Sequence, residues 1–419
     1  MTLNFPTMAD PEGRTLGDEE VAALERVIRS GMLNSVWGTE AKALEREMAQ
    51  LYGSRHAIAC SSGTAALHLS VVAAAPDPGD EIITTPITDF GTVAPILAQN
   101  AVPVFADVDP SDGNLDPSAV EALIGPRTRA IMAVHLFGAA ARIDELRALA
   151  DRHGLALIED CAQAWLTELP ARGPGLPAEG SGVPAQGSGV PAQGSGEELG
   201  GGARGVGGGR LAGIVGDVGT FSLQQWKHIT CGDGGVVITQ DDELARRMRL
   251  FSDKGWDRAA GRSHASLGLN YRMTELQAAV ARAQLAKLDG VLAARRRTAA
   301  HLLKALEGLQ GLRLPRPEGH AWWLFPLVLL DGGAGELAAH LGAAGIPARA
   351  GYLGEPLNRA PVWKGPLYGG SRYPLEGYTP AACPEAERLV AETLLVIDWN
   401  EHYTDEHVEL IAERIRNRP

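Results

Sequence analysis

The sequence predicts an α/β fold in which a mostly parallel sheet forms a large domain and a smaller α+β domain follows it. Short apolar runs alternate with amphipathic helical segments through residues 56–160, which is typical of βαβ units with helices on both faces of a sheet. Several of these runs end in polar or glycine-rich residues, at the sheet edge where such folds bind ligands. The chain has 419 residues, enough for two or three units of domain size.

Composition excludes several classes of protein. Hydrophobic residues make up 45% and charged residues 21% of the chain, as in ordinary soluble globular proteins. The net charge of −13 repels nucleic acid and anionic membranes, so we expect neither as a partner. No apolar run approaches the roughly 20 residues of a spanning helix. The first ten residues lack a signal peptide, and the four cysteines form no Cys-x-x-Cys pair. We therefore expect a cytoplasmic enzyme without a metal site.

Two helices are predicted before the first strand. Residues 1–30 are interpreted as an N-terminal arm and helix, and the helix over 18–31 is expected to be capped by Asp18. Its expected inward face consists of Val21, Leu24, Val27 and Ile28. A second helix is expected to start at Thr39 and to end at Gly53.

The alternating pattern then assigns the large domain, expected over residues 31–290. Strands are predicted at 57–60, 81–85, 102–108, 130–135, 156–160 and 236–239. Helices are predicted at 65–72, 90–99 with a break at Pro95, 117–123, 143–153, 242–251 and 273–288, and residues 252–272 are expected to form a loop. Residues 171–209 repeat a Gly, Pro, Ser and Ala-rich unit that cannot bury enough surface to fold, and are interpreted as a flexible surface insertion.

The smaller C-terminal domain is expected over residues 291–419. A long basic helix over 291–309 is followed by strands at 322–330 and 394–397, and by helices at 335–344 and 405–416.

The first candidate site is the turn Ser61-Ser62-Gly63-Thr64, which joins a strand to a helix. Free backbone N–H groups and the positive end of the helix dipole make such a turn suitable for an anion. A plain capped helix explains the same residues equally well.

The second candidate site combines an acid and a lysine. Asp160 ends a buried strand, and Lys227 follows a strand and precedes the glycine-rich turn at 232–235. An isolated lysine is ordinarily a solvated surface residue. A lysine amine and a carboxylate at the ends of neighbouring strands are, however, what pyridoxal 5'-phosphate (PLP) requires: one group for the Schiff base and one for the pyridinium nitrogen.

These motifs together resemble the DegT/DnrJ/EryC1/StrS aminotransferases, PLP enzymes that aminate keto-sugars and keto-cyclitols. The resemblance covers nearly all of the chain apart from the insertion. It rests on the segments 61–67, Val134-His135-Leu136-Phe137-Gly138, 159–164, 216–235 and Asn270-Tyr271-Arg272-Met273-Thr274-Glu275-Leu276-Gln277.

The resemblance implies a fold-type I PLP-dependent transferase and a homodimer with shared active sites. It implies that Lys227 is the Schiff-base lysine and proton shuttle and that Asp160 pairs with the pyridinium nitrogen. Gln163 is expected near the ring hydroxyl, and Phe90 at the place of an aromatic that stacks on the ring. The phosphate is expected to contact Gly63, Thr64, Ser222 and, from the other subunit, Asn270.

Several alternatives stay open at this point. Gln163 also fits a backbone-satisfying role, and Phe90 also fits the core because residues 88–91 depart from the commoner family pattern. Trp226 stands where a small residue usually precedes the lysine, and either reshapes the pocket or packs away from it. His228 is interpreted as structural. Arg349 and Tyr352 fit either substrate contact or a surface or packing role.

The expected function is transfer of an amino group from L-glutamate or L-glutamine to a nucleotide-linked keto-sugar or a keto-cyclitol. One alternative is a PLP-dependent sugar dehydratase of the same fold, which Lys227 disfavours because those relatives lack this lysine. The other is a non-catalytic homologue that acts as a sensor or partner protein.

Overall fold

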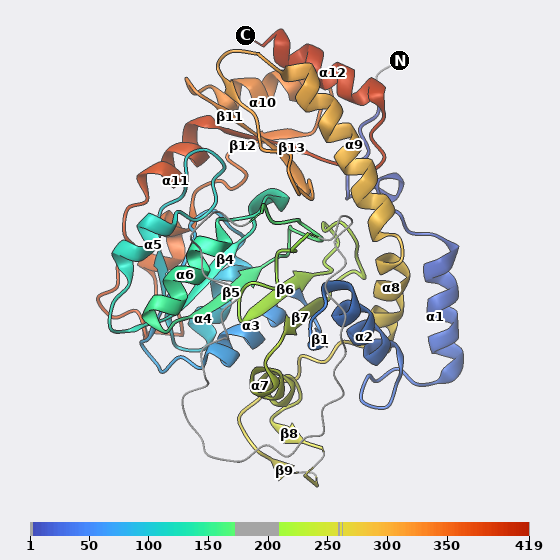
Figure 1. Ribbon diagram of the computed structural model, residues 1–419, viewed down its shortest axis with the longest axis vertical. Coiled ribbons are helices and arrows are strands. Elements are labelled where there is room, and N and C mark those ends of the chain that lie inside the picture. Colours follow the sequence, from blue (N-terminus) through green and yellow to red (C-terminus); the bar gives the residue numbers. More distant parts are fainter. Residues whose placement is uncertain (1–2, 172–208, 259, 262, 419) are drawn as a thin grey trace.

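The computed structural model describes residues 3–171, 209–258, 260–261 and 263–418. The predicted insertion at 171–209 therefore lies almost entirely outside the described residues. A large sheet with flanking helices occupies the lower part of Figure 1, and a smaller sheet lies above it. Helix α9 (Leu288–Leu306) runs alongside from one part to the other.

The large sheet has seven strands in the order β1-β7-β6-β5-β4-β2-β3. They are β1 (His56–Cys60), β2 (Glu81–Thr84), β3 (Val102–Phe105), β4 (Thr128–Val134), β5 (Ala156–Asp160), β6 (Val218–Ser222) and β7 (Gly235–Thr239). Strand β7 is antiparallel to both its neighbours, and the other pairs are parallel. The prediction of a mostly parallel sheet is confirmed, and β1 to β6 end at one common edge.

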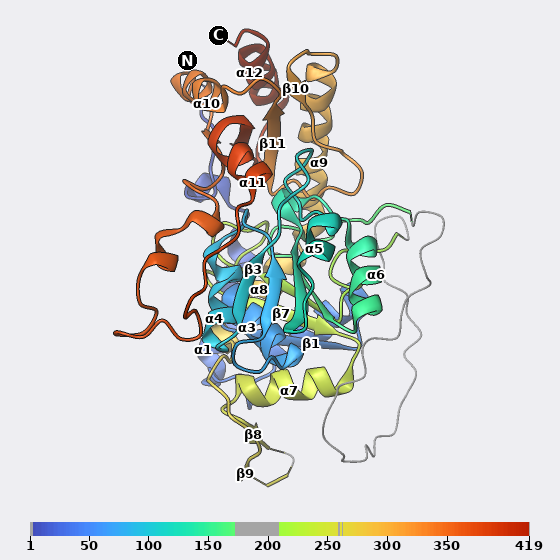
Figure 2. The ribbon, with the colours of Figure 1, turned by 90° about the vertical axis from the view of Figure 1, so that its left-hand side faces the viewer.

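Helices cover both faces of this sheet and bury its apolar side chains. One face packs against α2 (Glu40–Tyr52), α5 (Pro117–Leu123), α6 (Ile143–His153) and α8 (Glu275–Leu285). The other packs against α3 (Gly63–Ala74), α4 (Ala94–Ala98) and α7 (Asp242–Ser252). Figure 2 shows this layering from the side. Burial on both faces explains why the strands are continuous apolar runs rather than alternating ones.

The smaller sheet is antiparallel, in the order β10-β11-β13-β12. Its strands are β10 (Leu312–Arg313), β11 (Leu324–Leu329), β12 (Ala348–Ala350) and β13 (Leu394–Asp398). Helices α9, α10 (Ala334–Ala343) and α12 (Asp405–Arg416) share its core. A second apolar cluster, which includes Phe105 from the large domain and Trp323 and Val396 from the small one, joins the two domains. Beside it lies α11 (Pro384–Arg388), followed by a π-helical turn, Leu389–Thr393.

Helix α1 (Asp18–Ser30) differs from its prediction in the face that it buries. Ala23 and Val27 pack against Ala279 of α8, whereas Val21 and Ile28 are 65% and 64% exposed. The buried face is rotated by one residue because Glu20 turns inward. Its carboxylate accepts hydrogen bonds from Gln284 and Lys287, which satisfy it. The helix begins after Gly17 rather than after a cap at Asp18.

Helix α2 also gains its cap from a residue that the sequence did not indicate. Thr39 occupies the cap position without a side-chain bond. Instead the carboxylate of Glu275 accepts hydrogen bonds from the backbone N–H groups of Thr39 and Glu40, both at 2.7 Å. A distant acid thus satisfies the donors that every helix N-terminus leaves free.

Two further segments depart from their predictions. Residues 90–99 form a 3-10 turn, Phe90–Thr92, and the short helix α4, because Pro95 permits a helix only at its first positions. The predicted loop at 252–272 contains a two-stranded hairpin of β8 (Trp256–Asp257) and β9 (Ser263–His264). Further 3-10 turns lie at Pro11–Gly13, Leu136–Gly138, Leu357–Arg359 and Pro361–Lys364.

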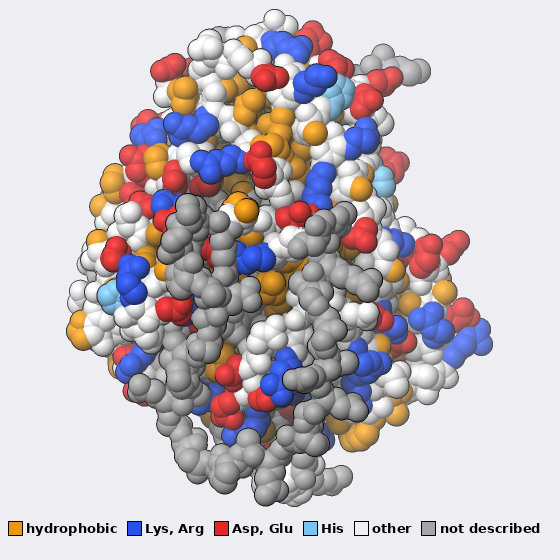
Figure 3. All heavy atoms as spheres, in the orientation of Figure 1, with side chains coloured by type: hydrophobic (Ala, Val, Ile, Leu, Met, Phe, Trp, Pro, Cys, Tyr) orange, Lys and Arg blue, Asp and Glu red, His pale blue; other side chains and the backbone are white. Residues whose placement is uncertain are grey.

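The surface is charged and mixed in sign. Figure 3 shows lysine, arginine, aspartate and glutamate side chains interspersed over the described part of one face. None of the helices in the described part of the chain is both long and apolar enough to span a membrane.

Candidate active site

A cavity of about 770 Å³ lies where the strands of the large sheet end and the small domain begins. Both domains and the N-terminal arm contribute to its wall. The lining includes Thr7, Met8, Ala9, Ser62, Gly63, Thr64, Asp89, Gly91, Thr92, Asp160, Gln163, Ser222, Trp226, Lys227, Asp233, Trp323, Arg349, Tyr352 and Asp398. Six of the eight residues predicted as site residues thus meet here, although up to 164 positions separate them in the sequence.

Lys227 lies in the segment after β6 and is held by its backbone. Its N–H donates to the carbonyl of Gln224 at 2.9 Å, and its own carbonyl accepts from Nη1 of Arg14 at 3.1 Å. Its Nζ lies 4.2 Å from the ring centroid of Trp323. Burial lowers the pKa of the Lys227 ammonium, and the negative charges of Asp160 and Asp89 only partly oppose this effect. The lower pKa favours the neutral amine, which is the nucleophilic and basic form.

Asp160 is the last residue of β5 and is held by two donors. Its Oδ1 accepts from the N–H of Ala162, and its Oδ2 accepts from the hydroxyl of Thr92, both at 3.0 Å. The Thr92 hydroxyl lies 2.7 Å from that of Thr88, so a short hydroxyl chain leads to the carboxylate. Burial raises the pKa of Asp160, and these donors together with Lys227 hold the rise in check.

A tight cradle forms where the turn after β1 meets the end of β6. A Cβ placed on Gly63 would lie 2.8 Å from both Cβ and Oγ of Ser222, so only glycine fits. The hydroxyl of Ser62 caps α3 by accepting from the N–H of Ala65 at 3.0 Å. The turn therefore caps a helix, and Gly63, Thr64 and Ser222 also line the cavity, while its role as an anion site stays a prediction.

Gln163 is buried and already bonded on both sides. Its Oε1 accepts from the N–H of Phe137 at 2.7 Å, and its Nε2 lies 3.4 Å from the hydroxyl of Tyr352. The side chain therefore supports the backbone, and it also lines the cavity.

Two predicted site residues lie outside this cavity. Phe90 is 37% exposed and its ring centroid lies 6.4 Å from that of Trp363. The stacking of Phe90 on a cofactor ring stays a prediction; its neighbours Asp89, Gly91 and Thr92 line the cavity. Asn270 is exposed and pairs with Asp253 across an isolated bridge, away from the cavity of its own chain.

Sequence reasoning missed three parts of the wall. Met8 is buried beside the cavity, and its carbonyl accepts from Nε2 of Gln225 at 3.3 Å. No local pattern around Met8 signals this contact. Trp323 lines the cavity from the small domain, and its indole N–H donates to the carbonyl of Trp226 at 2.6 Å. The third part is the pair Thr88 and Thr92. Two hydroxyl side chains four residues apart, just after a predicted strand, are the one sequence signal that could have indicated this part of the wall.

The two residues adjacent to Lys227 have different positions. Trp226 is 44% exposed and lines the cavity, so its indole shapes the entrance. His228 is fully buried and its Nε2–H donates to the carbonyl of Ala321 at 2.9 Å. Burial holds the pKa of His228 well below its ordinary value, so the ring is neutral and serves structure.

The observations above converge with the comparison to known proteins. Residues 14–416 match the DegT/DnrJ/EryC1/StrS aminotransferase family. The chain belongs to this family.

Solved structures agree with this assignment. S. venezuelae DesV, described in complex with a ketimine intermediate, is 31% identical, with a TM-score of 0.76 over 96% of this chain and 94% of DesV. The sugar aminotransferase CalS13 from Micromonospora echinospora is 25% identical, with a TM-score of 0.76 and coverage of 96% and 98%. DesI in the presence of its TDP-sugar product is 27% identical, with a TM-score of 0.72 and coverage of 97% and 91%. The chain is an aminotransferase of a PLP-dependent family with the expected α/β fold.

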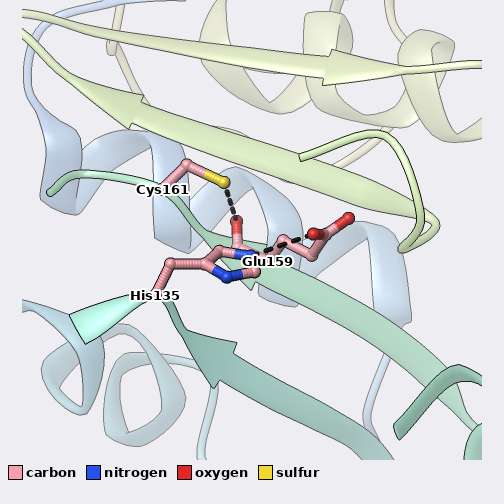
Figure 4. Close-up of side chains that lie close together, drawn as sticks. All are labelled: His135, Glu159 and Cys161. Atoms are coloured by element: carbon pink, nitrogen blue, oxygen red, sulfur yellow. Dashed lines mark hydrogen bonds and ion pairs between the residues drawn. The ribbon is translucent and has the colours of Figure 1, made fainter. Parts of the chain in front are cut away.

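One cluster behind the cavity of this aminotransferase has a composition that suggests a metal site. His135, Glu159 and Cys161 bring their ligand atoms within 4.8 Å of one another (Figure 4). His135 Nδ1 accepts from the N–H of Ala141 at 3.0 Å, so Nε2 carries the proton and donates to Glu159 at 2.9 Å. Burial raises the pKa of the Cys161 thiol well above its usual value. A protonated thiol is a poor metal ligand, and so is an imidazole whose two nitrogens are both engaged in hydrogen bonds. The cluster is therefore better explained as structural.

Glu159 is the centre of that cluster and ties β5 to the segment that leads into β6. Besides His135, its carboxylate accepts from the N–H groups of Gly213 and Val215, each at 2.8 Å, and of Gly216 at 2.5 Å. Burial disfavours the charge, but these donors hold the pKa of Glu159 below its ordinary value.

We expect Glu159→Gln to lower the free energy of unfolding by about 3 kcal/mol, because the new amide N–H₂ faces N–H donors. Urea unfolding measures the difference. Since the folded-state pKa is depressed, the stabilisation is present above the unfolded value and disappears as the pH falls through the folded one. The gap between the two proteins should therefore shrink below about pH 4. Glu121→Gln, which breaks an exposed pair with Arg152, is the control and should change stability by about 0.5 kcal/mol or less.

We expect Thr92→Val to destabilise the charged form of the Asp160 carboxylate without unfolding the protein. Loss of the hydroxyl removes a donor that stabilises the charged carboxylate, so the pKa of Asp160 rises further. The acidic limb of the activity profile should therefore move to higher pH. A pH series of kcat/KM measures this shift. Thr92→Ser keeps the hydroxyl and should restore the wild-type profile; equal shifts in both variants would contradict the assigned role.

Proposed function

We propose that this enzyme transfers an amino group from L-glutamate or L-glutamine to a keto-sugar or keto-cyclitol, with PLP bound in the cavity described above. The convergence of Lys227, Asp160 and the Gly63–Ser222 cradle in one cavity carries the proposal. Membership of the aminotransferase family and similarity to CalS13 and DesI support the sugar class of acceptor.

The residues present fit PLP in three independent ways. Gly63, whose close approach to Ser222 excludes any side chain, lines the cavity with Thr64 and Ser222 at the N-terminus of α3, a setting that suits a phosphate. Asp160 lies buried at a strand end, as a partner for a ring nitrogen must. Lys227 offers an amine whose lowered pKa favours attachment to an aldehyde. When bound, PLP supplies an electron-accepting ring conjugated with the reacting carbon.

The protein's own contribution divides between two residues. Lys227 would hold the cofactor through its Nζ, and its free amine would be the base that takes the proton from the donor's α-carbon and returns one to the product. Asp160 keeps its negative charge through Ala162 and Thr92 and thereby stabilises a positive ring nitrogen. The apolar walls at Met8 and Trp323 limit water near the reacting atoms.

The absorbance spectrum of the PLP-loaded protein tests this proposal. Addition of the true donor should remove the band of the lysine-bound cofactor, and a 2-oxo acid should restore it. A panel of keto-sugars and keto-cyclitols then identifies the acceptor by the same recovery. A lysine-bound cofactor that no amino acid changes would contradict amino transfer and favour a dehydratase or a non-catalytic role.

We further propose a homodimer in which Asn270 completes the partner's site. Asn270 lies on an exposed segment where Leu267 and Leu269 are 82% and 43% exposed, as expected of a surface that another subunit covers. Light scattering should give twice the monomer mass.

Mixing inactive variants provides the functional test of that arrangement. A heterodimer of Lys227→Ala and Asn270→Ala chains contains one site with both residues intact if Asn270 acts across the interface. Random mixing should therefore recover about one quarter of wild-type activity. No recovery, despite exchange of subunits shown by mass spectrometry, would place Asn270 outside the partner's site.

A further inference from the structure

Arg349 is the second cation in the described lining of the cavity, after Lys227. It lies on β12, opposite Val396 of β13, and Asp398 lies two residues further along β13 on the same face of the small sheet. Nη1 of Arg349 pairs with Oδ1 of Asp398. An arginine and an aspartate thus enter the cavity together from the small domain.

The guanidinium of Arg349 is only partly used by this pair. Its side chain is 41% exposed, and its bond to Asp398 within the described part of the chain involves one nitrogen of three. An arginine has five N–H donors in a planar fork that matches a carboxylate. Arg349 can therefore donate hydrogen bonds to a second carboxylate while its bond to Asp398 stays in place.

Arg349 is also close to the reacting end of the cavity. Its charge acts on the Tyr352 hydroxyl, whose pKa burial raises well above the usual range. That hydroxyl lies 3.4 Å from Nε2 of Gln163, three residues beyond Asp160. Asp160, Gln163, Tyr352 and Arg349 thus line one cavity.

We propose that Arg349 binds the carboxylate of the amino-acid donor and that Asp398 binds hydroxyl groups of the polyol acceptor. This inference rests on the proposed function, which requires one cavity to hold two unlike substrates in turn. The donor carries a carboxylate beside the reacting carbon, and the acceptor carries hydroxyls. With the acceptor bound, Asp398 neutralises Arg349 and accepts hydrogen bonds from hydroxyls, so neither charge is left unpaired. With the donor bound, the free edge of Arg349 takes the carboxylate.

The test compares a donor with its α-carboxamide in two proteins. The PLP-loaded full chain and its Arg349→Gln variant are mixed with the amino acid that the wild type uses, L-glutamate or L-glutamine, or with the same compound amidated at the α-carboxyl group. The rate of the spectral change against donor concentration gives the specificity constant of the first half-reaction. The amide alters the intrinsic reactivity equally in both proteins, so the ratio of acid to amide isolates the carboxylate contact.

We expect the variant to lose about 10- to 100-fold on the acid but less than about threefold on the amide. The acid-to-amide ratio should therefore fall by about 3- to 100-fold. Arg349→Lys keeps the charge without the fork and should lie between the two. Because the Arg349–Asp398 pair is exposed, its loss should leave the fold intact, which circular dichroism checks.

Arg359 offers a matched control. It forms a similarly exposed ion pair, with Glu387, in the same domain and outside the cavity lining. Arg359→Gln should leave the acid-to-amide ratio unchanged. For the second part of the proposal, Asp398→Asn should raise the KM of the acceptor more than that of the donor.

Two results overturn the inference separately from the proposed function. If the wild type reacts with an amino acid but Arg349→Gln keeps the wild-type ratio, or loses equally on acid and amide, Arg349 does not bind the carboxylate. If the wild type reacts with no amino acid, the proposed function fails first and the inference falls with it.

Discussion

Replacement of Lys227 by alanine is expected to lower the rate of amino transfer by about 10⁴-fold or more, because one side chain has two roles. In the proposed function it attaches the cofactor and also moves the proton that amino transfer requires. The partly buried setting beside Trp323 suits both roles, since the lowered pKa favours the neutral, nucleophilic form of the amine. Loss of the amine also removes the group that borohydride reduction would link to PLP.

Mass spectrometry after borohydride treatment and steady-state assay therefore measure the two roles of Lys227 separately. Wild type should gain the mass of reduced cofactor on the peptide that contains Lys227, and the variant should gain none. Lys304→Ala, at an exposed position on α9, should keep both the label and the activity. A Lys227→Ala protein that retained activity within tenfold of wild type would refute the assignment.

The fold was predictable because its signals are local. Each large-domain strand is buried on both faces and therefore reads as a short apolar run, and each helix between strands has its own amphipathic period. The antiparallel direction of β7 has no such local signal. The composition of the segment between β6 and β7, which contains Lys227, does not tell whether it returns as a turn to an antiparallel strand or crosses over to a parallel one. The buried face of α1 was predicted wrongly because Gln284 and Lys287 determine it from a distance.

The site was predictable only where function restricts a residue's type. Lys227 and Asp160 follow or end strands at positions where neither burial nor turn formation requires a lysine or an aspartate. A chemical role is therefore the simplest explanation for these residue types. The ring-stacking role of Phe90 rests on the family resemblance alone and stays a prediction. In the structure Phe90 lies beside Trp363, a contact between residues more than 270 positions apart that no local pattern signals. Met8 and Arg14 reach the cavity through contacts across the whole chain, for which no sequence pattern exists.

Removal of the carboxylate in Asp160→Ala is expected to lower the rate of amino transfer by about 10²- to 10³-fold. In the proposed function buried Asp160 keeps a ring nitrogen protonated, and the hydrogen bonds from Ala162 and Thr92 favour its charged form. Without that charge the nitrogen loses its proton in a poorly solvated site and the ring becomes a weaker electron acceptor. Covalent labelling at Lys227 should persist, because attachment does not need the carboxylate.

A cofactor analogue methylated at the ring nitrogen distinguishes this electrostatic role from a structural one. The methyl group fixes the positive charge, and the alanine side chain leaves space for it. If Asp160 acts by stabilising the positive charge on the ring nitrogen, Asp160→Ala should be at least about tenfold more active with the analogue than with PLP. The analogue should not improve the wild type. If Asp160 only supports the local fold, through its bonds to Ala162 and Thr92, the analogue should restore nothing. The two outcomes differ because charge can be supplied by the ligand, whereas missing hydrogen bonds to the protein cannot.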